Sequence, residues 1–186
     1  MSVTEPAVRH LTASQAPYIR VDLRPWEYAL VAQIGAARAA RNHNRPDAKH
    51  YDRSRMEDDR TAQHASCAAE CATARAFDRY WTAGGAWDSG DHARYKDLAD
   101  VGQNIEVRRI REPSSTTFAV DERDRDRIVV ACYVEPPELQ VVRVFGWARG
   151  ADALAAGEVA EKYPSRRRVP LSVLSLKGVI GKVVLP

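Results

Sequence analysis

The chain has 186 residues, of which 45% are apolar and 28% are charged, and its formal net charge is +3. This composition excludes a fully disordered or fibrous chain, and the length suits one domain with a substantial core. We expect an N-terminal arm over residues 1–20 and a single domain over residues 21–186.

The longest apolar run, Ile128 to Val134, has seven residues, whereas a membrane-spanning helix needs about 20. The first residues show neither a basic start nor an apolar stretch, so no secretory signal is expected. An odd number of cysteines, three, favours a reducing compartment. These features predict a cytoplasmic protein without a membrane partner. A monomer or dimer is what we expect of a nuclease or a binding protein of this size.

The N-terminal half of the chain predicts helices. After a short strand at Val21–Leu23, Trp26 to Ala40 follows a proline and repeats its apolar residues at helical spacing. The polar, charged stretch from Arg41 to Arg60 predicts an exposed loop. The alanine-rich segment from Thr61 to Trp81 predicts a second helix, whose small residues would let it lie close against a sheet.

Strand-forming sequences dominate the second half. The expected strands are Asn104–Ile110, Thr116–Val120 and a hairpin of Ile128–Val134 with Leu139–Trp147. Ala151–Lys162 is weakly helical, and Val169–Leu176 predicts a late strand or short helix. This order predicts an α/β (α+β) fold in which a mixed sheet is flanked by two N-terminal helices.

The stretch from Asp100 to Arg108 is the most informative for chemistry. Alternate residues of a strand share a face, so Glu106 and Arg108 would point together, opposite Ile105 and Val107. With Asp100 just before the strand, two carboxylates and a cation would suit Mg²⁺ and a phosphate oxygen. The same residues also suit an ordinary strand face on which Glu106 pairs with a neighbouring arginine.

Glu70 lies in the middle of the alanine-rich helix, on a stripe of small and apolar residues. An unpaired buried charge is costly. We therefore expect this carboxylate either at the margin of the packed face or directed into a site.

Several short motifs resemble a known superfamily. They are His64-x5-Glu70, Asp100-Val101-Gly102, Glu106-Val107-Arg108, Phe145-Gly146-Trp147 and Val169-Pro170. Together, over roughly residues 20–176, they resemble the PD-(D/E)XK nucleases, and more closely a group of small phage and prophage proteins from GC-rich hosts that are described as nuclease-like.

This resemblance implies a restriction-endonuclease-like core in a protein of a bacterial or phage-infected cell. It implies that Asp100 and Glu106 are ligands of Mg²⁺ or Mn²⁺, with Glu70 as the helix carboxylate that supports the metal. Arg108 stands where the superfamily usually has Lys. Because arginine stays charged, it could stabilise a developing negative charge but could not act as a base.

Two functions follow from the resemblance. The first is metal-dependent hydrolysis of nucleic-acid phosphodiesters, of DNA before RNA, by Glu70, Asp100, Glu106 and Arg108. The alternative is a non-catalytic protein on the same fold that binds nucleic acid or another protein. The arginine in place of lysine and the modest net charge favour the alternative.

Other residues offer weaker signals. His64, Cys67 and Cys71 share one helix face and, with Cys132, offer four soft metal ligands, although free cysteines are commonly just buried. Further candidates for phosphate contact or base stacking, each with an ordinary structural alternative, are Arg108–Arg109, Arg166–Arg168, Trp81, Trp87 and Tyr95. On the nuclease resemblance, Lys96 could supply an ammonium group from another position.

Overall fold

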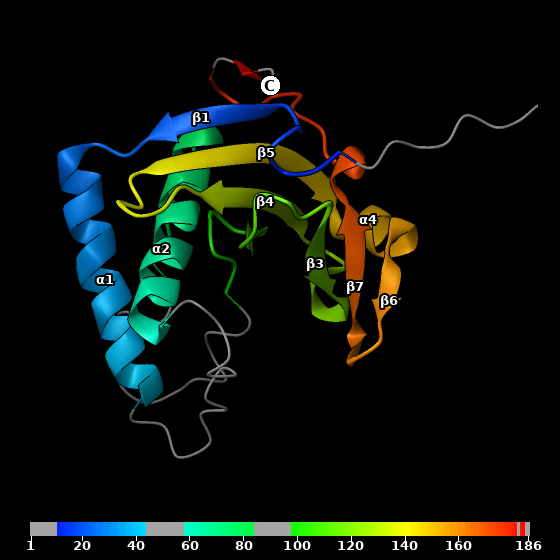
Figure 1. The fold of residues 1–186 in the computed structure, drawn as a ribbon, viewed down its shortest axis with the longest axis horizontal. Helices are drawn as coiled ribbons and strands as arrows, with labels where there is room; N and C mark the ends of the chain where they lie inside the picture. Colours follow the sequence, from blue (N-terminus) through cyan, green and yellow to red (C-terminus); the bar gives the residue numbers. More distant parts are fainter. Residues whose placement is uncertain (1–10, 44–57, 84–97, 182, 185–186) are drawn as a thin grey trace, which may run out of the picture.

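The computed structural model describes residues 11–43, 58–83, 98–181 and 183–184. In these residues, helix α2 (Asp59–Ala76) packs on one face of a five-stranded sheet, and helix α1 (Pro25–His43) packs against α2. A three-stranded sheet and the short helix α4 (Gly150–Ala156) cover the other face (Figure 1). The expected mixed α+β class, with two N-terminal helices against a mixed sheet, is confirmed.

The larger sheet has the order β2-β4-β5-β1-β8, and the smaller sheet has the order β3-β7-β6. The strands of the larger sheet are β1 (Tyr18–Asp22), β2 (Ile105–Ile110), β4 (Ile128–Val134), β5 (Val141–Arg149) and β8 (Val183–Val184). Those of the smaller sheet are β3 (Thr117–Asp121), β6 (Glu158–Ala160) and β7 (Tyr163–Pro170). Every pairing is antiparallel except that of β2 with β4.

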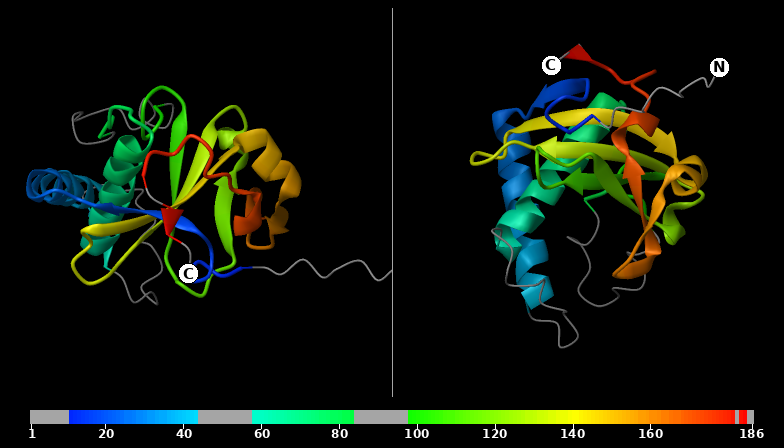
Figure 2. Two further views of the ribbon diagram at one scale, coloured as in Figure 1. Left: turned by 90° about the horizontal axis from the view of Figure 1, so that it is seen from above. Right: turned by 45° about the vertical axis from the view of Figure 1, so that its right-hand side comes forward.

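The larger sheet separates two cores, and strand β4 contributes to both. Val130 and Cys132 pack against the helices, whereas Val129 and Ala131 pack against the smaller sheet and α4. This alternation follows from the two-residue period of a strand. Figure 2 shows the helices and the smaller sheet on opposite sides of the larger one. A strand buried on both faces has a continuous apolar sequence, as Ile128–Val134 does.

Helices α1 and α2 lie unusually close because Gly35 faces His64. A Cβ atom on Gly35 would come within 2.8 Å of the His64 Cα. An ion pair at the other end of the helices joins Glu27 of α1 to Arg75 of α2 at 2.8 Å. The Glu27 carboxylate also accepts the Arg24 amide, which closes the first turn of α1.

The alanine-rich helix is shorter than the sequence predicts. It ends at Ala76 instead of Trp81, because Asp78 adopts a left-handed backbone conformation with φ 50°. It begins at Asp59, where the Asp58 carboxylate caps it by accepting the Thr61 amide at 2.7 Å.

The prediction of a weak helix over Ala151–Lys162 is wrong in its second half. The helix stops at Ala156, and β6 follows it after Gly157. A Cβ atom on Gly157 would lie 2.9 Å from the Val169 side chain, so the chain passes tightly over β7 there. Pairing with β7, which a local pattern does not encode, makes this segment a strand.

The remaining differences concern boundaries. Strand β1 begins at Tyr18, earlier than the expected Val21, and α1 continues to His43. Val169 and Pro170 are the last residues of β7, and a short 3₁₀ turn, Leu171–Val173, follows them. Most of the expected loop at 41–60, together with Trp87, Tyr95 and Lys96, lies outside the described residues. None of the helices described here is long and apolar enough to cross a bilayer.

Candidate functional site

The three predicted carboxylates approach strand β2, at the edge of the larger sheet, from three directions. Glu70 comes from α2, on the helical face, and Glu106 extends from β2 toward the smaller sheet. Asp100 precedes β2 and accepts a hydrogen bond from the Val107 amide at 2.8 Å. Gly102, with φ 57°, makes the turn between Asp100 and the strand, as its place in the sequence predicts.

Glu70 is buried, and both oxygens of its carboxylate accept hydrogen bonds. Two parallel hydrogen bonds, of 2.6 and 2.7 Å, join it to the Arg38 guanidinium of α1. The Trp81 indole N–H donates to the same carboxylate at 2.8 Å. The sequence predicts neither partner. In this arrangement Glu70 joins α1 to α2, and Trp81 is occupied as a hydrogen-bond donor.

Glu106 lies between arginines. The parallel register pairs Ile105 with Ile128, which places Arg127 beside the first residues of β2. There the Arg127 guanidinium donates to the Glu106 carboxylate. Arg108, two residues along the same face, lies 3.2 Å from the other oxygen. The shared face of Glu106 and Arg108 is confirmed, but it faces a second core instead of solvent.

Arg108 is held by acidic side chains that the sequence does not single out. Its Nε and Nη2 atoms donate to the buried Asp124 carboxylate of the turn that follows β3. Asp121, at the end of β3, is 3.9 Å away and pairs with Arg166 of β7 at 3.2 Å. We call Glu106, Arg108, Asp121, Asp124 and Arg127, joined by these contacts, the β2 ion-pair network.

The network fixes the charge of Arg108. Burial alone would lower the pKa of this guanidinium, but the neighbouring carboxylates of Glu106 and Asp124 outweigh burial and raise it. The only sequence signal for the missing partners is the acidic string Asp121-Glu122-Arg123-Asp124 between two strands. That string gives no indication of which strand it will face.

The carboxyl group of Asp100 has a strongly raised pKa. Burial, followed by the negative charges of Glu70 and Glu106, raises its pKa well above the usual range of a carboxyl group. The Val107 amide and Arg108 act in the opposite direction without reversing this effect. Perturbed acids of this kind are concentrated at functional sites.

The predicted metal site requires Glu70, Asp100 and Glu106 to share one cation. Oxygen donors suit Mg²⁺, but arginines and an indole already occupy Glu70 and Glu106. Within the described residues, no three acidic, histidine or cysteine side chains are grouped so that they could hold an ion. In this arrangement the residues do not fit a Mg²⁺ or Mn²⁺ centre.

A cleft of about 240 Å³ opens beside β2. One wall is α2, from Asp59 to Glu70, and the other is formed by β3 and β7. The arginines that line it are Arg108 and Arg109 of β2, Arg111 directly after β2, and Arg166 of β7. Arginine side chains along β2 and on the β7 wall of one groove suit a ligand with repeated negative charges.

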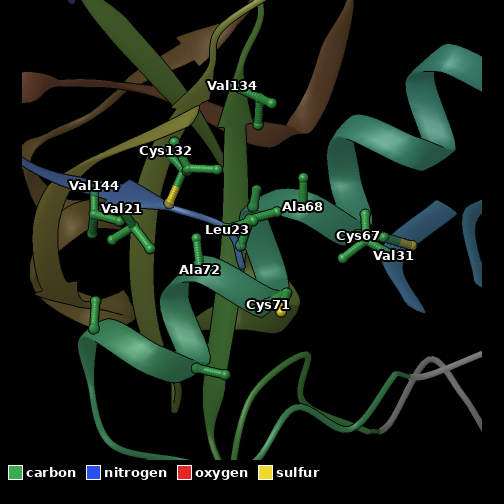
Figure 3. Close-up of a cluster of buried hydrophobic side chains, with 14 of the residues drawn as sticks. Val21, Leu23, Val31, Cys67, Ala68, Cys71, Ala72, Cys132, Val134 and Val144 are labelled. Atoms are coloured by element: carbon green, nitrogen blue, oxygen red, sulfur yellow. The ribbon is translucent and has the colours of Figure 1, made fainter. Parts of the chain in front are cut away.

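The cysteines contribute to the core. Cys67, Cys71 and Cys132 are buried in the core that the two helices form with the larger sheet (Figure 3). Burial raises the pKa of both Cys71 and Cys132 to about 12, so these thiols are protonated at neutral pH. They form no metal-binding group with His64 in the part of the chain that is described.

No family model matches the chain, and neither a curated protein nor a solved structure is detectably similar to it. The resemblance to the PD-(D/E)XK nucleases therefore rests on the short sequence motifs given above.

Proposed function

We propose that this protein binds nucleic acid, DNA in the first instance, through the sugar-phosphate backbone in the cleft beside β2, and does so without a metal ion. One observation carries the proposal: four arginines from β2, β7 and the chain after β2 line a single cleft. Arginine forks match phosphate oxygens in geometry as well as in charge.

The electrostatics of the site support binding over hydrolysis. Glu70 is neutralised by Arg38, Glu106 by Arg108 and Arg127, and Asp121 by Arg166, so these three carboxylates do not present bare negative charge. Burial and neighbouring carboxylates also favour the protonated form of Asp100. A phosphate thus meets less repulsion than the number of acids suggests.

The same proposal includes a restriction-endonuclease-like core. The arrangement of a helix carboxylate, a turn aspartate and a Glu-x-Arg strand around one sheet edge supports it. On this proposal the chain keeps the framework of the nuclease site and uses arginines where the superfamily uses a metal and a lysine.

The test is the binding of a short fluorescein-labelled DNA duplex, followed by anisotropy over a series of salt concentrations. We expect Arg166→Gln and Arg111→Gln each to weaken binding and to reduce the slope of log K against log salt by about one. Arg149→Gln, on an exposed residue at the end of β5, is the matched control and should bind as the wild type does. Equal binding by all variants would contradict the proposal, and no binding by the wild type would favour a protein partner.

Metal-dependent DNA hydrolysis is the second candidate, and the approach of the Glu70, Asp100 and Glu106 carboxylates to one strand favours it. It requires Glu70 and Glu106 to release their arginines. Calorimetric titration with Mg²⁺ and a plasmid-nicking assay on wild type and Asp100→Asn would decide between the two candidates. Metal binding and nicking that the substitution abolishes would establish the nuclease. An intact plasmid, together with a titration that shows no heat of Mg²⁺ binding, would exclude the nuclease under those conditions.

A further inference from the structure

The carboxylate of Asp124 is fully buried, at 0% exposure, in a place where a charge is expensive. Its Oδ2 atom accepts hydrogen bonds from Nε and Nη2 of Arg108 and from the Asp121 amide. Its Oδ1 atom makes no hydrogen bond, and the nearest cation to it is Arg123 at 3.8 Å. Asp124 therefore commits one oxygen to Arg108 and leaves the other unsatisfied.

The backbone places Asp124 with little freedom. Asp124 is the last residue of a 3₁₀ turn, Glu122–Asp124. Its carbonyl oxygen lies against Gly150, the first residue of α4. A Cβ atom on Gly150 would lie 1.8 Å from the Asp124 carbonyl oxygen, so only glycine permits this approach. The Gly150 amide donates to the Arg127 carbonyl at 2.7 Å, and the Arg127 amide donates to the Asp124 carbonyl at 2.9 Å. The turn is thus fixed against α4.

The Asp124 carboxylate has a local structural role, since it accepts the Asp121 amide in the capping box of its own turn, but that role does not require the ion pair with Arg108. A buried ion pair usually contributes no more to folding than apolar residues of the same volume, because desolvation cancels most of the attraction. The unsatisfied Oδ1 atom increases that cost. What the pair does provide is orientation, since two donors of one guanidinium converge on a fixed oxygen.

We infer that Asp124 is a positioning residue, which holds the guanidinium of Arg108 in place for a phosphate in the cleft. Asp124 occupies the Nε and Nη2 side of the guanidinium, and Glu106 lies 3.2 Å from Nη1. Arg108 lines the cleft, and a guanidinium has five N–H donors, so donors remain for a ligand there. This inference rests on the proposed function of the cleft.

The first test is spectroscopic and uses the wild-type protein without ligand. The Arg108 Nε–H should give a resolved ¹⁵N signal that exchanges slowly with water, because a buried carboxylate accepts it. Asp124→Asn should shift this signal and increase its exchange, whereas Asp126→Asn, at an exposed residue of the same loop, should leave it unchanged. An Arg108 Nε–H that exchanges in the wild type as fast as that of a free arginine would overturn the inference.

The second test uses binding of the same labelled DNA duplex. Loss of a hydrogen bond to a charged group predicts about tenfold weaker binding by Asp124→Asn, with Asp126→Asn as control. Because Asp124 acts through Arg108, the substitution should have no further effect in an Arg108→Gln background. Arg108→Lys keeps the charge but loses the planar fork, so it should weaken binding similarly even if Asp124→Asn does not fold.

The outcomes separate this inference from the proposed function. Wild-type protein that binds no DNA contradicts the proposed function, and the exchange of the Arg108 Nε–H then decides whether Asp124 holds this side chain. Wild-type protein that binds DNA, together with a folded Asp124→Asn that binds equally well, contradicts the inference alone.

Discussion

Replacing Glu70 by glutamine separates a structural from a catalytic role for this residue. The substitution keeps the shape and the oxygen that accepts from Trp81, but it removes the charge facing Arg38. The two side chains are only 7% and 12% exposed, and the pKa of Arg38, which burial would lower, is raised by Glu70, so the guanidinium stays charged. Removing one partner of a buried pair costs about 3–5 kcal/mol. Relief of the repulsion on Asp100 offsets part of this, so we expect a loss of about 3 kcal/mol.

The assay is urea unfolding followed by circular dichroism on the wild type, Glu70→Gln, Arg38→Gln and the double variant. The double variant should lose less than the sum of the single losses, with a coupling of about 2 kcal/mol. If Glu70 belonged to a strained acidic centre, its neutralisation would relieve repulsion instead. A Glu70→Gln protein as stable as the wild type, or more stable, would refute the ion-pair interpretation.

Three further predictions follow from burial and packing. The folded pKa of Asp100 is raised above its unfolded value of about 3.9, so wild-type stability falls as pH rises from about 4 through the folded pKa. The Tm of Asp100→Asn minus that of the wild type should therefore increase with pH, and a constant difference would contradict this. Gly150→Ala should cost about 3 kcal/mol in urea unfolding because its Cβ meets the Asp124 carbonyl, whereas the exposed Ala151→Ser should cost nothing measurable. All three cysteines are buried and free, so a thiol reagent should modify none in the native state and three after unfolding; rapid native labelling would be inconsistent with the core.

Local patterns in the sequence predicted the local parts of the fold. The start of α1 at Pro25, the β4–β5 hairpin and the turn at Gly102 each depend on neighbours within a few residues. The common face of Glu106 and Arg108 required only the period of a strand. The contacts of Glu106 and Arg108 with distant parts of the chain depend on how the smaller sheet and α2 pack around β2. A short stretch of sequence does not encode this tertiary packing.

The partners of the candidate acids were missed because they are distant along the chain. Arg38 is 32 residues from Glu70, and its one signal is its place four residues after the buried Ile34 on α1. Arg127 reaches Glu106 only because β2 and β4 pair in parallel. The acids of the short motifs lie near one edge of the larger sheet. Whether they bind a metal ion or pair with arginines is decided by these non-local contacts.

Titration of a fluorescein-labelled DNA duplex in EDTA and again in Mg²⁺, with the DNA recovered and sized after each titration, tests the central claim most directly. Because arginines instead of a cation neutralise the acids beside the cleft, we predict the same Kd in both buffers and uncut DNA in both. Binding that requires Mg²⁺, or cleavage that appears with Mg²⁺ and disappears in Asp100→Asn, would contradict it.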